Sequence, residues 1–515
     1  MKITPYLKFV TFLYFAISAV GCAQNKELTT AKPNVVLIYL DDLGYGDLSC
    51  YGATELQTPN IDKLANGGIL FKNGYATSAT CTPSRYGILT GVYPWRNKDA
   101  KILPGTAPLL ISTKQETIAK VFQTKGYETA VIGKWHLGLG TGNVNWNAHI
   151  SPGPNEVGFD YSHIMAATQD RVPTVYIENG NVVGLDPKDP IEVNYNNNYP
   201  VEPTAISNPE LLKMKWHHGH NNSIVNGIPR IGFMKGGKSA KWTDVDMADH
   251  FLAKATAYVK EHKNKPFFLY YALQEPHVPR TPNPRFVGKS GMGPRGDVIL
   301  EADWIIGQFV ASLEAEGMLE NTLIVFSSDN GPVLNDGYED DAVEKLGNHD
   351  PKGGLRGGKY SLLDAGAHVP FITYWKGTIK PKVSDALVCQ MDLMASLATL
   401  IGANASPTDS QDILHAFLGK SDKGRKTLIL EANTKTILRE GDWLMIPPYQ
   451  GLPVIADVQI ETGFSEDYQL YNVKKDPAQK DNVAKSNPKK LAKLIANFEE
   501  LRGDAYSNIQ KLELK

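Results

Sequence analysis

The stretch Val35-Val36-Leu37-Ile38-Tyr39-Leu40-Asp41-Asp42 decides the fold. Its apolar residues run without alternation, which is typical of a strand buried on both faces of a parallel sheet. Similar runs occur at residues 130–132, 267–271 and 323–326. Stretches with helical spacing lie between or beside these runs, at residues 59–66, 118–125, 245–262 and 297–316. Strands that alternate with helices predict an α/β fold built on a doubly wound sheet.

Polar residues follow the end of each of the four runs. They are Asp41 and Asp42 after the first run, Lys134 and His136 after the second, His277 after the third, and Asp329 and Asn330 after the fourth. Ligands of open α/β sheets bind outside the carboxyl ends of the strands. We therefore expect these side chains to meet at one edge of the sheet and to form a site.

The acidic members of this group favour a hard cation. Asp41, Asp42, Asp329 and Asn330 offer only oxygen ligands, which suit Ca²⁺ or Mg²⁺ better than thiolate-preferring metals. The alternative is that Asp42 and Asn330 cap turns, because Asn330-Gly331 is a common turn pair.

The basic members favour an anionic substrate. Arg85, Lys134, His136, His277 and Lys359 all lie in Gly- or Pro-rich turns near predicted strand ends. Positive charges around a metal indicate a sulfate or phosphate group on the substrate. For either lysine alone, a solvated surface position is the alternative.

Cys81 lies in Cys81-Thr82-Pro83-Ser84-Arg85, just before a helix predicted over residues 84–89. The positive end of a helix dipole favours an anionic nucleophile or a bound oxyanion there. A buried apolar cysteine and a thiolate nucleophile are the alternatives. Neither alternative accounts for the Cys-x-Pro-x-Arg spacing.

Motifs in this sequence resemble those of the formylglycine-dependent (type I) sulfatases, in the order of that family. They are residues 41–47 as the first metal motif, 81–85 with 89–91 as the signature, 133–138 as the second signature and 328–331 as the second metal motif. The resemblance spans residues 34 to about 375 and continues more weakly to the C-terminus. It implies an alkaline-phosphatase-like fold and one Ca²⁺ per site.

The resemblance also implies a role for each matching residue. Asp41, Asp42, Asp329 and Asn330 would bind Ca²⁺, and another enzyme would convert Cys81 to formylglycine, whose hydrate attacks sulfur. Arg85 would hold the hydrated aldehyde, and Lys134 and Lys359 would neutralise the sulfate oxygens. His277 would protonate the leaving alcohol, and His136 would help to regenerate the aldehyde.

One segment departs from the family pattern. Where the family commonly shows Glu-Gly-Gly-x-Arg-Val-Pro, this chain reads Asp364-Ala365-Gly366-Ala367-His368-Val369-Pro370. The spacing to Lys359 is kept. The departure therefore puts the support of this loop in doubt more than the chemistry.

Substrate choice is expected to depend on the irregular stretch 143–241, because long irregular loops in enzymes usually shape substrate binding. Asp170 and Arg171 can bind a sugar diol, and His220 can contact a further hydroxyl. A loop-stabilising salt bridge and a surface histidine are the alternatives. These pieces resemble bacterial sulfatases that remove 6-O-sulfate from galactose or N-acetylgalactosamine, which implies exo-acting hydrolysis of sulfated glycans. Glucosamine-6-, galactose-3- or galactose-4-sulfatases remain alternatives, as does a phosphoesterase of the same superfold.

The first 22 residues are expected to be a signal peptide. Lys2 and Lys8 precede an apolar run over residues 9–21, which is too short to span a bilayer comfortably. The small residues before Cys22 resemble a bacterial lipoprotein cleavage site, and a plain signal peptide is the alternative. We expect an exported protein of the periplasm or the outer membrane, with membrane attachment through a lipidated Cys22.

Composition limits the remaining possibilities. The chain has 515 residues, 42% of them hydrophobic, and a net charge of −2, so we expect no nucleic-acid binding. Four cysteines exclude a disulfide framework, and Cys50 and Cys389 are either two thiols or one disulfide. We expect a catalytic domain over residues 32–405 and a smaller α+β subdomain over 406–515. That subdomain would hold strands near 427–430, 443–446 and 468–473 and a helix over 489–502.

Overall fold

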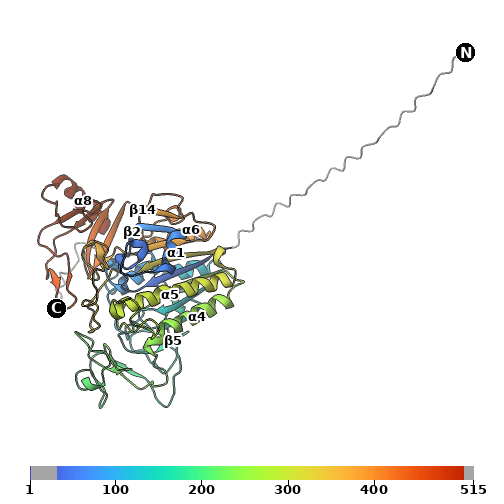
Figure 1. Cartoon of the computed structure of the whole chain (residues 1–515), viewed down its shortest axis with the longest axis vertical. Helices are drawn as coiled ribbons and strands as arrows, with labels where there is room; N and C mark the ends of the chain where they lie inside the picture. Colours follow the sequence, from blue (N-terminus) through green and yellow to red (C-terminus); the bar gives the residue numbers. More distant parts are fainter. Residues whose placement is uncertain (2–31, 504–515) are drawn as a thin grey trace. The chain divides into compact units, whose positions relative to one another are not determined.

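The structure is a computed structural model, and it describes residue 1 and residues 32–503. The predicted signal segment with Cys22 lies outside the described residues. Residues 33–503 form one compact unit (Figure 1). None of the described helices is long and apolar enough to cross a bilayer.

The central sheet contains ten strands and confirms the predicted α/β fold class. Its order is β14-β2-β13-β12-β1-β11-β3-β4-β5-β6. In chain order these strands are β1 (Asn34–Leu40), β2 (Ile69–Tyr75), β3 (Glu128–Lys134), β4 (Tyr161–Met165), β5 (Tyr176–Glu178), β6 (Asn181–Val182), β11 (Phe267–Ala272), β12 (Thr322–Ser328), β13 (Phe371–Tyr374) and β14 (Lys382–Cys389). The sheet is mixed, because β13, β5 and β6 run antiparallel to their neighbours.

Helices cover both faces of this sheet. One core contains Val35, Leu37 and Tyr39, and the other contains the alternate residues Val36, Ile38 and Leu40. On the first face lie α2 (Cys81–Thr90), α3 (Ile118–Gln123) and α6 (Leu393–Leu400). On the second lie α1 (Pro59–Gly67), α4 (Met247–Glu261) and α5 (Gly293–Ala315), as Figure 1 shows. A strand packed on both faces explains the unbroken apolar run of β1.

The strand register aligns the residues that carry the site. β1 lies between β12 and β11 and runs parallel to both, with Leu40 opposite Ser328. β11 in turn runs parallel to β3, with Ala272 opposite Gly133. The four predicted strands are therefore neighbours that end together at one edge.

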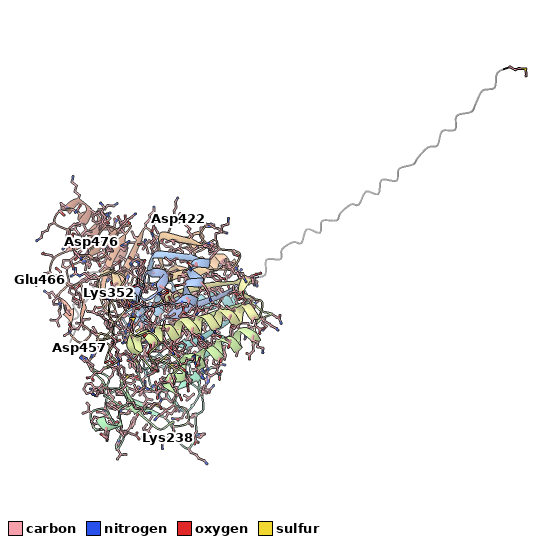
Figure 2. All side chains as sticks on the ribbon, viewed as in Figure 1. Lys238, Lys352, Asp422, Asp457, Glu466 and Asp476 are labelled. Carbon is pink, nitrogen blue, oxygen red and sulfur yellow. The ribbon has the colours of Figure 1, made fainter. Side chains whose placement is uncertain are left out.

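The stretch 143–241 is as irregular as expected. Its short strands outside the central sheet are β7 (Glu192–Asn194) with β10 (Phe233–Lys235), and β8 (Ile224–Val225) with β9 (Ile228–Pro229). Exposed charges of both signs lie on the surface, among them Lys238, Asp422 and Glu466 in Figure 2.

A second, antiparallel sheet follows in the C-terminal region, and its apolar cluster also includes Tyr75 of β2 and Cys389 of β14. It contains β15 (Thr427–Ala432), β16 (Lys435–Glu440), β17 (Trp443–Ile446) and β20 (Gln469–Asn472), and α8 (Pro488–Arg502) packs on it. The strands β18 (Val454–Ile455) and β19 (Ile460–Glu461) form a separate pair, whereas α7 (Leu414–Phe417) packs in the core of the central sheet. β16 was not predicted from the sequence, because its apolar centre is short and flanked by charges. The boundary at residue 405 stays a prediction. Cys50 and Cys389 are free thiols, so the disulfide alternative is wrong.

Candidate active site

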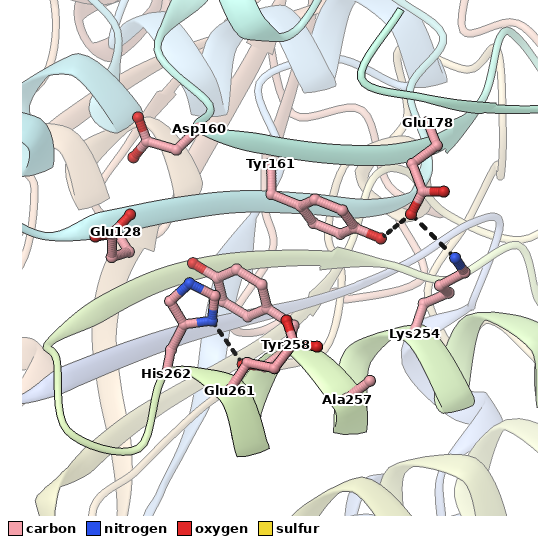
Figure 3. A pocket seen from close by; sticks show the side chains of 9 residues that line it. All are labelled: Glu128, Asp160, Tyr161, Glu178, Lys254, Ala257, Tyr258, Glu261 and His262. Carbon is pink, nitrogen blue, oxygen red and sulfur yellow. Dashed lines mark hydrogen bonds and ion pairs between the residues drawn. The ribbon is translucent and has the colours of Figure 1, made fainter. Parts of the chain in front are cut away.

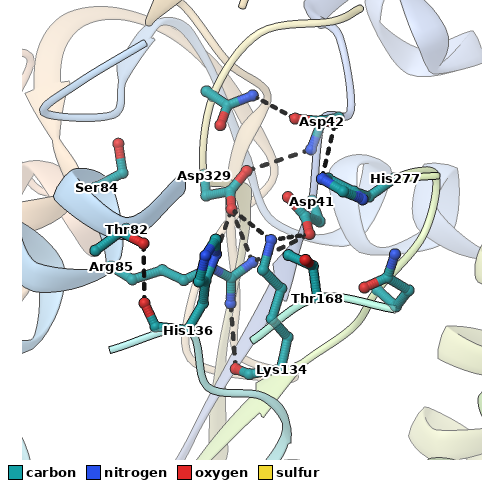
Figure 4. Close-up of polar contacts among 12 residues, drawn as sticks. Asp41, Asp42, Thr82, Ser84, Arg85, Lys134, His136, Thr168, His277 and Asp329 are labelled. Carbon is teal, nitrogen blue, oxygen red and sulfur yellow. Dashed lines mark hydrogen bonds and ion pairs between the residues drawn. The ribbon is translucent and has the colours of Figure 1, made fainter. Parts of the chain in front are cut away.

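The metal-binding candidates meet where β1 and β12 end. The backbone N–H of Asp42 donates to Asp329 Oδ1 at 3.2 Å, and Asn330 Nδ2 donates to Asp42 Oδ1 at 2.7 Å. All four candidate ligands are at most 1% exposed. Asp42 adopts a left-handed backbone conformation with φ of 63°, which turns the chain sharply after the strand. The structure thus brings together all four residues that the sequence analysis selected, as Figure 4 shows for the three aspartates.

These residues fit a hard cation. Asp41 Oδ1 and Asn330 Oδ1 are buried and have no hydrogen-bond partner among the described residues. Asn330 Nδ2 also donates to the carbonyl of Gly331 at 2.9 Å, so the amide oxygen is the atom left without a partner. Ligand atoms of Asp41, Asp42 and His277 lie within 4.8 Å of one another, as do those of Asp41, Cys81 and Asp329. Unpaired oxygens among clustered carboxylates are what Ca²⁺ or Mg²⁺ would satisfy.

Cys81 is the first residue of α2, three residues earlier than the helix that the sequence predicts. Thr80 before it is extended, and every residue of the helix is buried. Burial raises the pKa of Cys81 to about 11, although the charges of Lys134 and Lys359 oppose the shift. The unmodified side chain is therefore a neutral thiol at neutral pH, which disfavours the thiolate alternative.

Arg85 joins α2 to the strand ends. Its Nε and Nη2 lie 3.0 and 2.8 Å from Asp329 Oδ2, and its Nη1 donates to the carbonyl of Lys134 at 3.3 Å and to the Tyr270 hydroxyl at 3.2 Å. This fully buried guanidinium therefore fixes one turn of the Cys81 helix against β12, β3 and β11.

The two predicted lysines lie against the carboxylates. Lys134 Nζ forms a close ion pair with Asp41, and Lys359 Nζ lies 2.8 Å from Asp42 Oδ2. Both lysines are at most 1% exposed, so neither is a solvated surface residue. Lys359 has a second partner, Asp336, whose Oδ2 lies 2.9 Å from Nζ. Asp336 was not selected from the sequence, because it sits in an irregular stretch with no nearby motif.

His277 faces the carboxylate group from the loop after β11. Its Nδ1 hydrogen-bonds to the carbonyl of Val278 at 2.7 Å, and its Nε2 lies 3.8 Å from Asp42 Oδ2. Gln274 Nε2 donates to the same carbonyl at 3.2 Å and thus supports the loop. Burial lowers the pKa of His277 well below its ordinary value, and the charges of Lys359 and Lys134 add to this effect.

His136 is fully buried beside Lys134 and has a left-handed backbone, with φ of 54°. Its Nε2 hydrogen-bonds to the carbonyl of Leu103 at 2.9 Å, whereas its Nδ1 has no partner among the described residues. Burial, and then the charge of Lys134, lowers its pKa well below the ordinary value. The neutral ring therefore donates through Nε2 and keeps a lone pair on Nδ1.

The three candidate sugar-binding residues form one cluster. Asp170 Oδ2 lies 2.8 Å from His220 Nε2, and Arg171 Nη1 lies 3.1 Å from both Asp170 oxygens. Burial raises the pKa of Asp170, but Arg171 and the hydrogen bond from His220 outweigh it, so the pKa lies well below the ordinary value. Gly337 lies against His220, and the preceding residue Asp336 pairs with Lys359, so this cluster adjoins the reaction centre.

The segment that departs from the family pattern is held by its own hydrogen bonds. His368 Nδ1 lies 2.8 Å from Asp364 Oδ2, and Tyr75 donates its hydroxyl to Asp364 Oδ1 at 2.8 Å. The His368 ring also stacks on that of Tyr75. An acidic and a basic residue thus still lie four residues apart, as in the family pattern, and their contact supports the loop.

A pocket of about 360 Å³ lies elsewhere, between the sheet and α4 (Figure 3). Its walls include Glu128, the first residue of β3, whereas Lys134 at the site is the last. The pocket therefore opens at the opposite end of the strand, away from Cys81.

Comparison with known proteins gives a consistent family. The sulfatase family model matches residues 33–403. The chain is 48% identical to an N-acetylgalactosamine-6-O-sulfatase of Bacteroides thetaiotaomicron over 492 residues, which covers 94% of this chain and 96% of that protein. It is 31% identical to human arylsulfatase A, with 77% of this chain and 70% of that protein covered.

A solved structure shares this architecture. It comes from work on glycosaminoglycan metabolism by Bacteroides thetaiotaomicron, and it superposes with a TM-score of 0.90 at 48% identity. The match covers 92% of this chain and 99% of the other. The agreement therefore includes the C-terminal region as well as the central sheet.

Proposed function

The chain belongs to the sulfatase family and is a sulfuric ester hydrolase with an alkaline-phosphatase-like fold, and from that premise we propose that it removes 6-O-sulfate from galactose or N-acetylgalactosamine at the ends of sulfated glycans. The observation that carries this proposal is the similarity to an N-acetylgalactosamine-6-O-sulfatase along 94% of the chain. The Asp170–Arg171–His220 cluster supports it, because a carboxylate beside a guanidinium and an imidazole can bind neighbouring sugar hydroxyls.

Sulfatases of this family generally use a formylglycine and a metal ion. We propose that the formylglycine forms at Cys81, installed by a separate maturation enzyme, and that the metal is Ca²⁺ held by Asp41, Asp42, Asp329 and Asn330. When present, the modified residue supplies an oxygen nucleophile for sulfur and Ca²⁺ draws charge from the sulfate oxygens. The unpartnered oxygens of Asp41 and Asn330 support the metal assignment.

The chain's own cations bind and polarise the sulfate group. Lys134 and Lys359 lie against the carboxylates, beside Cys81, and can neutralise sulfate oxygens as charge moves toward the leaving oxygen. Arg85, held by Asp329, orients residue 81 from one turn further along α2. Because these groups are buried and already ordered, little reorganisation is needed during the reaction.

The two histidines can handle protons at different steps of the reaction. His277 presents Nε2 toward the metal site and is neutral in the free protein. A bound sulfate anion offsets the charges of Lys134 and Lys359, which raises the pKa of His277 and lets it protonate the leaving oxygen. His136 can accept a proton at Nδ1, the atom that has no partner among the described residues.

Sulfate release from a panel of sugars tests the proposed function. Protein from a host that installs formylglycine, supplied with Ca²⁺, would be offered 6-, 4- and 3-O-sulfated galactose, N-acetylgalactosamine and N-acetylglucosamine. We expect release from the 6-sulfates of the first two sugars and none from a Cys81→Ala variant. Release confined to 3- or 4-sulfates, or to N-acetylglucosamine, would contradict the specificity. A mass spectrum of the Cys81 peptide confirms that the tested protein carries formylglycine.

We also propose that the chain is exported to the periplasm or the outer membrane and is anchored through a lipidated Cys22. The support is sequence alone: Lys2 and Lys8, the apolar run 9–21 and the small residues before Cys22. A sulfatase at the cell surface would meet large extracellular glycans directly.

A further inference from the structure

Asp336 lies between the sulfate-binding and sugar-binding parts of the site. Its Oδ2 is 2.9 Å from Lys359 Nζ, and Lys359 Nζ is 2.8 Å from Asp42 Oδ2. Asp336 is 8% exposed and the other two residues are 1% exposed. One buried ammonium is thus shared by two carboxylates, only one of which is a proposed metal ligand.

The backbone around Asp336 is fixed on the sugar-binding side. Gly337 has a φ of +95°, and a Cβ at this position would lie 1.8 Å from His220 Nδ1. The carbonyl of Gly337 accepts the backbone N–H of His217 at 2.9 Å, and the Tyr338 hydroxyl donates to the carbonyl of Pro229 at 2.6 Å. Asp336 is therefore presented by a loop that packs directly against the segment carrying His220.

The backbone of Lys359 is fixed on the other side. Its N–H donates to the carbonyl of Pro332 at 3.0 Å, four residues before Asp336. Both ends of the ion pair thus belong to one stretch that begins just after Asn330. The next residue, Tyr360, donates its backbone N–H to the carbonyl of Ala79 at 2.8 Å, so Lys359 lies near the segment that carries Cys81.

The two carboxylates differ in what they can offer Lys359. A carboxylate that ligates a divalent cation shares its charge with that cation and is a weaker partner for an ammonium. Asp42 is a proposed Ca²⁺ ligand, whereas Asp336 is not. When the metal is bound, Asp336 is the carboxylate that remains to hold Lys359, since a buried ammonium needs a partner.

We propose that Asp336 is a positioning residue that holds the Lys359 ammonium against the sulfate group. This inference rests on the proposed sulfatase function. Asp336 acts through Lys359 and not by contacting the sugar. Its loss should therefore impair the hydrolysis of every substrate, because all substrates carry the sulfate group. In this respect it differs from Asp170, which is proposed to contact the sugar itself.

The variant Asp336→Asn tests this inference, because it keeps the shape of the side chain and removes its charge. We expect kcat/KM to fall about 10- to 100-fold, the usual range for a group that orients a ligand-binding residue. The fall should be similar on N-acetylgalactosamine 6-sulfate and on 4-nitrophenyl sulfate. Binding of inorganic sulfate, measured by calorimetry, should weaken as well. A loss confined to the sugar substrate would overturn the inference.

A double-mutant cycle with Lys359→Met isolates the route of the effect. If Asp336 acts through Lys359, adding Asp336→Asn to Lys359→Met should cause no further loss of kcat/KM or of sulfate binding. Losses that multiply would show independent action and overturn the inference. The double variant replaces a buried ion pair by two neutral groups, so this comparison holds even where Asp336→Asn alone is unstable.

Asp341→Asn is the matched control, because Asp341 lies in the same stretch and is solvent-exposed in a pair with Lys345. It should leave turnover, sulfate binding and melting temperature unchanged. Sulfate binding separates this inference from the proposed function. Wild-type protein that releases no sulfate from any sugar would contradict the proposed function, whereas equal sulfate binding by wild type and Asp336→Asn would contradict the role of Asp336.

Discussion

Individual side chains in this site divide into two groups with different partners, which we propose to face the sulfate and the sugar respectively. Lys134 and Lys359 pair with carboxylates at the strand ends, next to Cys81. Asp170 and His220 bond to each other in a separate cluster with Arg171. Because the two groups use different partners, substitutions in them should affect different parts of the substrate.

Asp170→Ala should therefore discriminate between substrates. Arg171 and His220 keep the pKa of Asp170 well below its ordinary value despite burial, so the residue is a carboxylate at neutral pH and accepts hydrogen bonds. Losing a charged acceptor to a sugar hydroxyl should lower kcat/KM on a 6-sulfated galactoside by about 10- to 100-fold. Hydrolysis of 4-nitrophenyl sulfate, measured in parallel, should change far less. Equal losses on both substrates would rule out sugar recognition.

Sequence patterns predict the residues at strand ends much better than those in loops. Asp41 and Asp329 were found because each follows a buried apolar run, and the register of β1 with β12 places them together. Asp336 contacts the predicted residue Lys359, and Gln274 supports the loop that carries the predicted residue His277. Neither Asp336 nor Gln274 belongs to a family motif or a periodic pattern. Their positions depend on loop packing, which local sequence does not encode.

At the scale of elements, the predicted strands and most predicted helix starts agree with the structure, since α1 and α3 begin where predicted, but the start of α2 was predicted too late. β1 begins one residue before its predicted run, whereas α2 begins at Cys81 and not at Ser84. Cys81 and Thr82 are weak helix formers, and Pro83 is tolerated only in the first turn. Arg85 bound to Asp329 supplies the tertiary contact that stabilises this turn. A residue that propensity places in a loop is thereby held at a helix N-terminus.

β15 of the small sheet connects to the loop before α2 through Glu431. The backbone N–H of Glu431 donates to the carbonyl of Thr77 at 3.2 Å, and the carbonyl of Glu431 accepts the N–H of Ala79 at 2.7 Å. The side chain is buried, and burial raises its pKa to about 8. The C-terminal sheet is thus joined to the segment that carries Cys81 beside a carboxyl that is neutral at pH 7.

Glu431→Gln should change how the stability of the protein depends on pH. In the unfolded chain a glutamate titrates near pH 4.3, so unfolding between that pH and about 8 releases a proton from Glu431. The folded state binds more protons over this window, and its stability therefore falls as pH rises. Replacing Glu431 by glutamine removes this proton binding. The free energy of unfolding should then fall less with rising pH than in the wild type, by a few kcal/mol at most.

Melting temperatures of wild type and Glu431→Gln at pH 5.5 and pH 8.5 test this expectation. The wild-type value should drop more than that of the variant over this rise in pH. Glu440→Gln, on the next strand and partly exposed, serves as the control and should follow the wild type at both pH values. A variant that loses stability equally at both pH values would mean that the carboxyl is ionised when folded.

Across the whole molecule, the site lies where several cores and segments meet. The edge of the central sheet carries the acids, α2 carries Cys81, and the stretch after β12 carries Lys359. Burial, and then the charge of Asp329, raises the pKa of Asp41 well above its ordinary value. The charges of Lys134 and Arg85 act in the opposite direction but do not outweigh this effect, so a bound cation would stabilise the fold further at this junction.

Removal of Ca²⁺ should therefore weaken the molecule as well as stop turnover. A ligand that binds only the folded state stabilises it by about 2.7 kcal/mol at a concentration of 100 times its Kd. We expect chelation by EGTA to lower the melting temperature by a few degrees and to abolish sulfate release, and added Ca²⁺ to restore both. The Cys81→Ala variant should show the same thermal response without turnover, because its carboxylates are intact. Asp41→Asn should lose most of that response, since it removes one charge from the proposed ligand set.

A melting temperature that is the same in EGTA and in Ca²⁺ would contradict a cation at this edge of the sheet, because nothing else in the proposal links the ion to the fold.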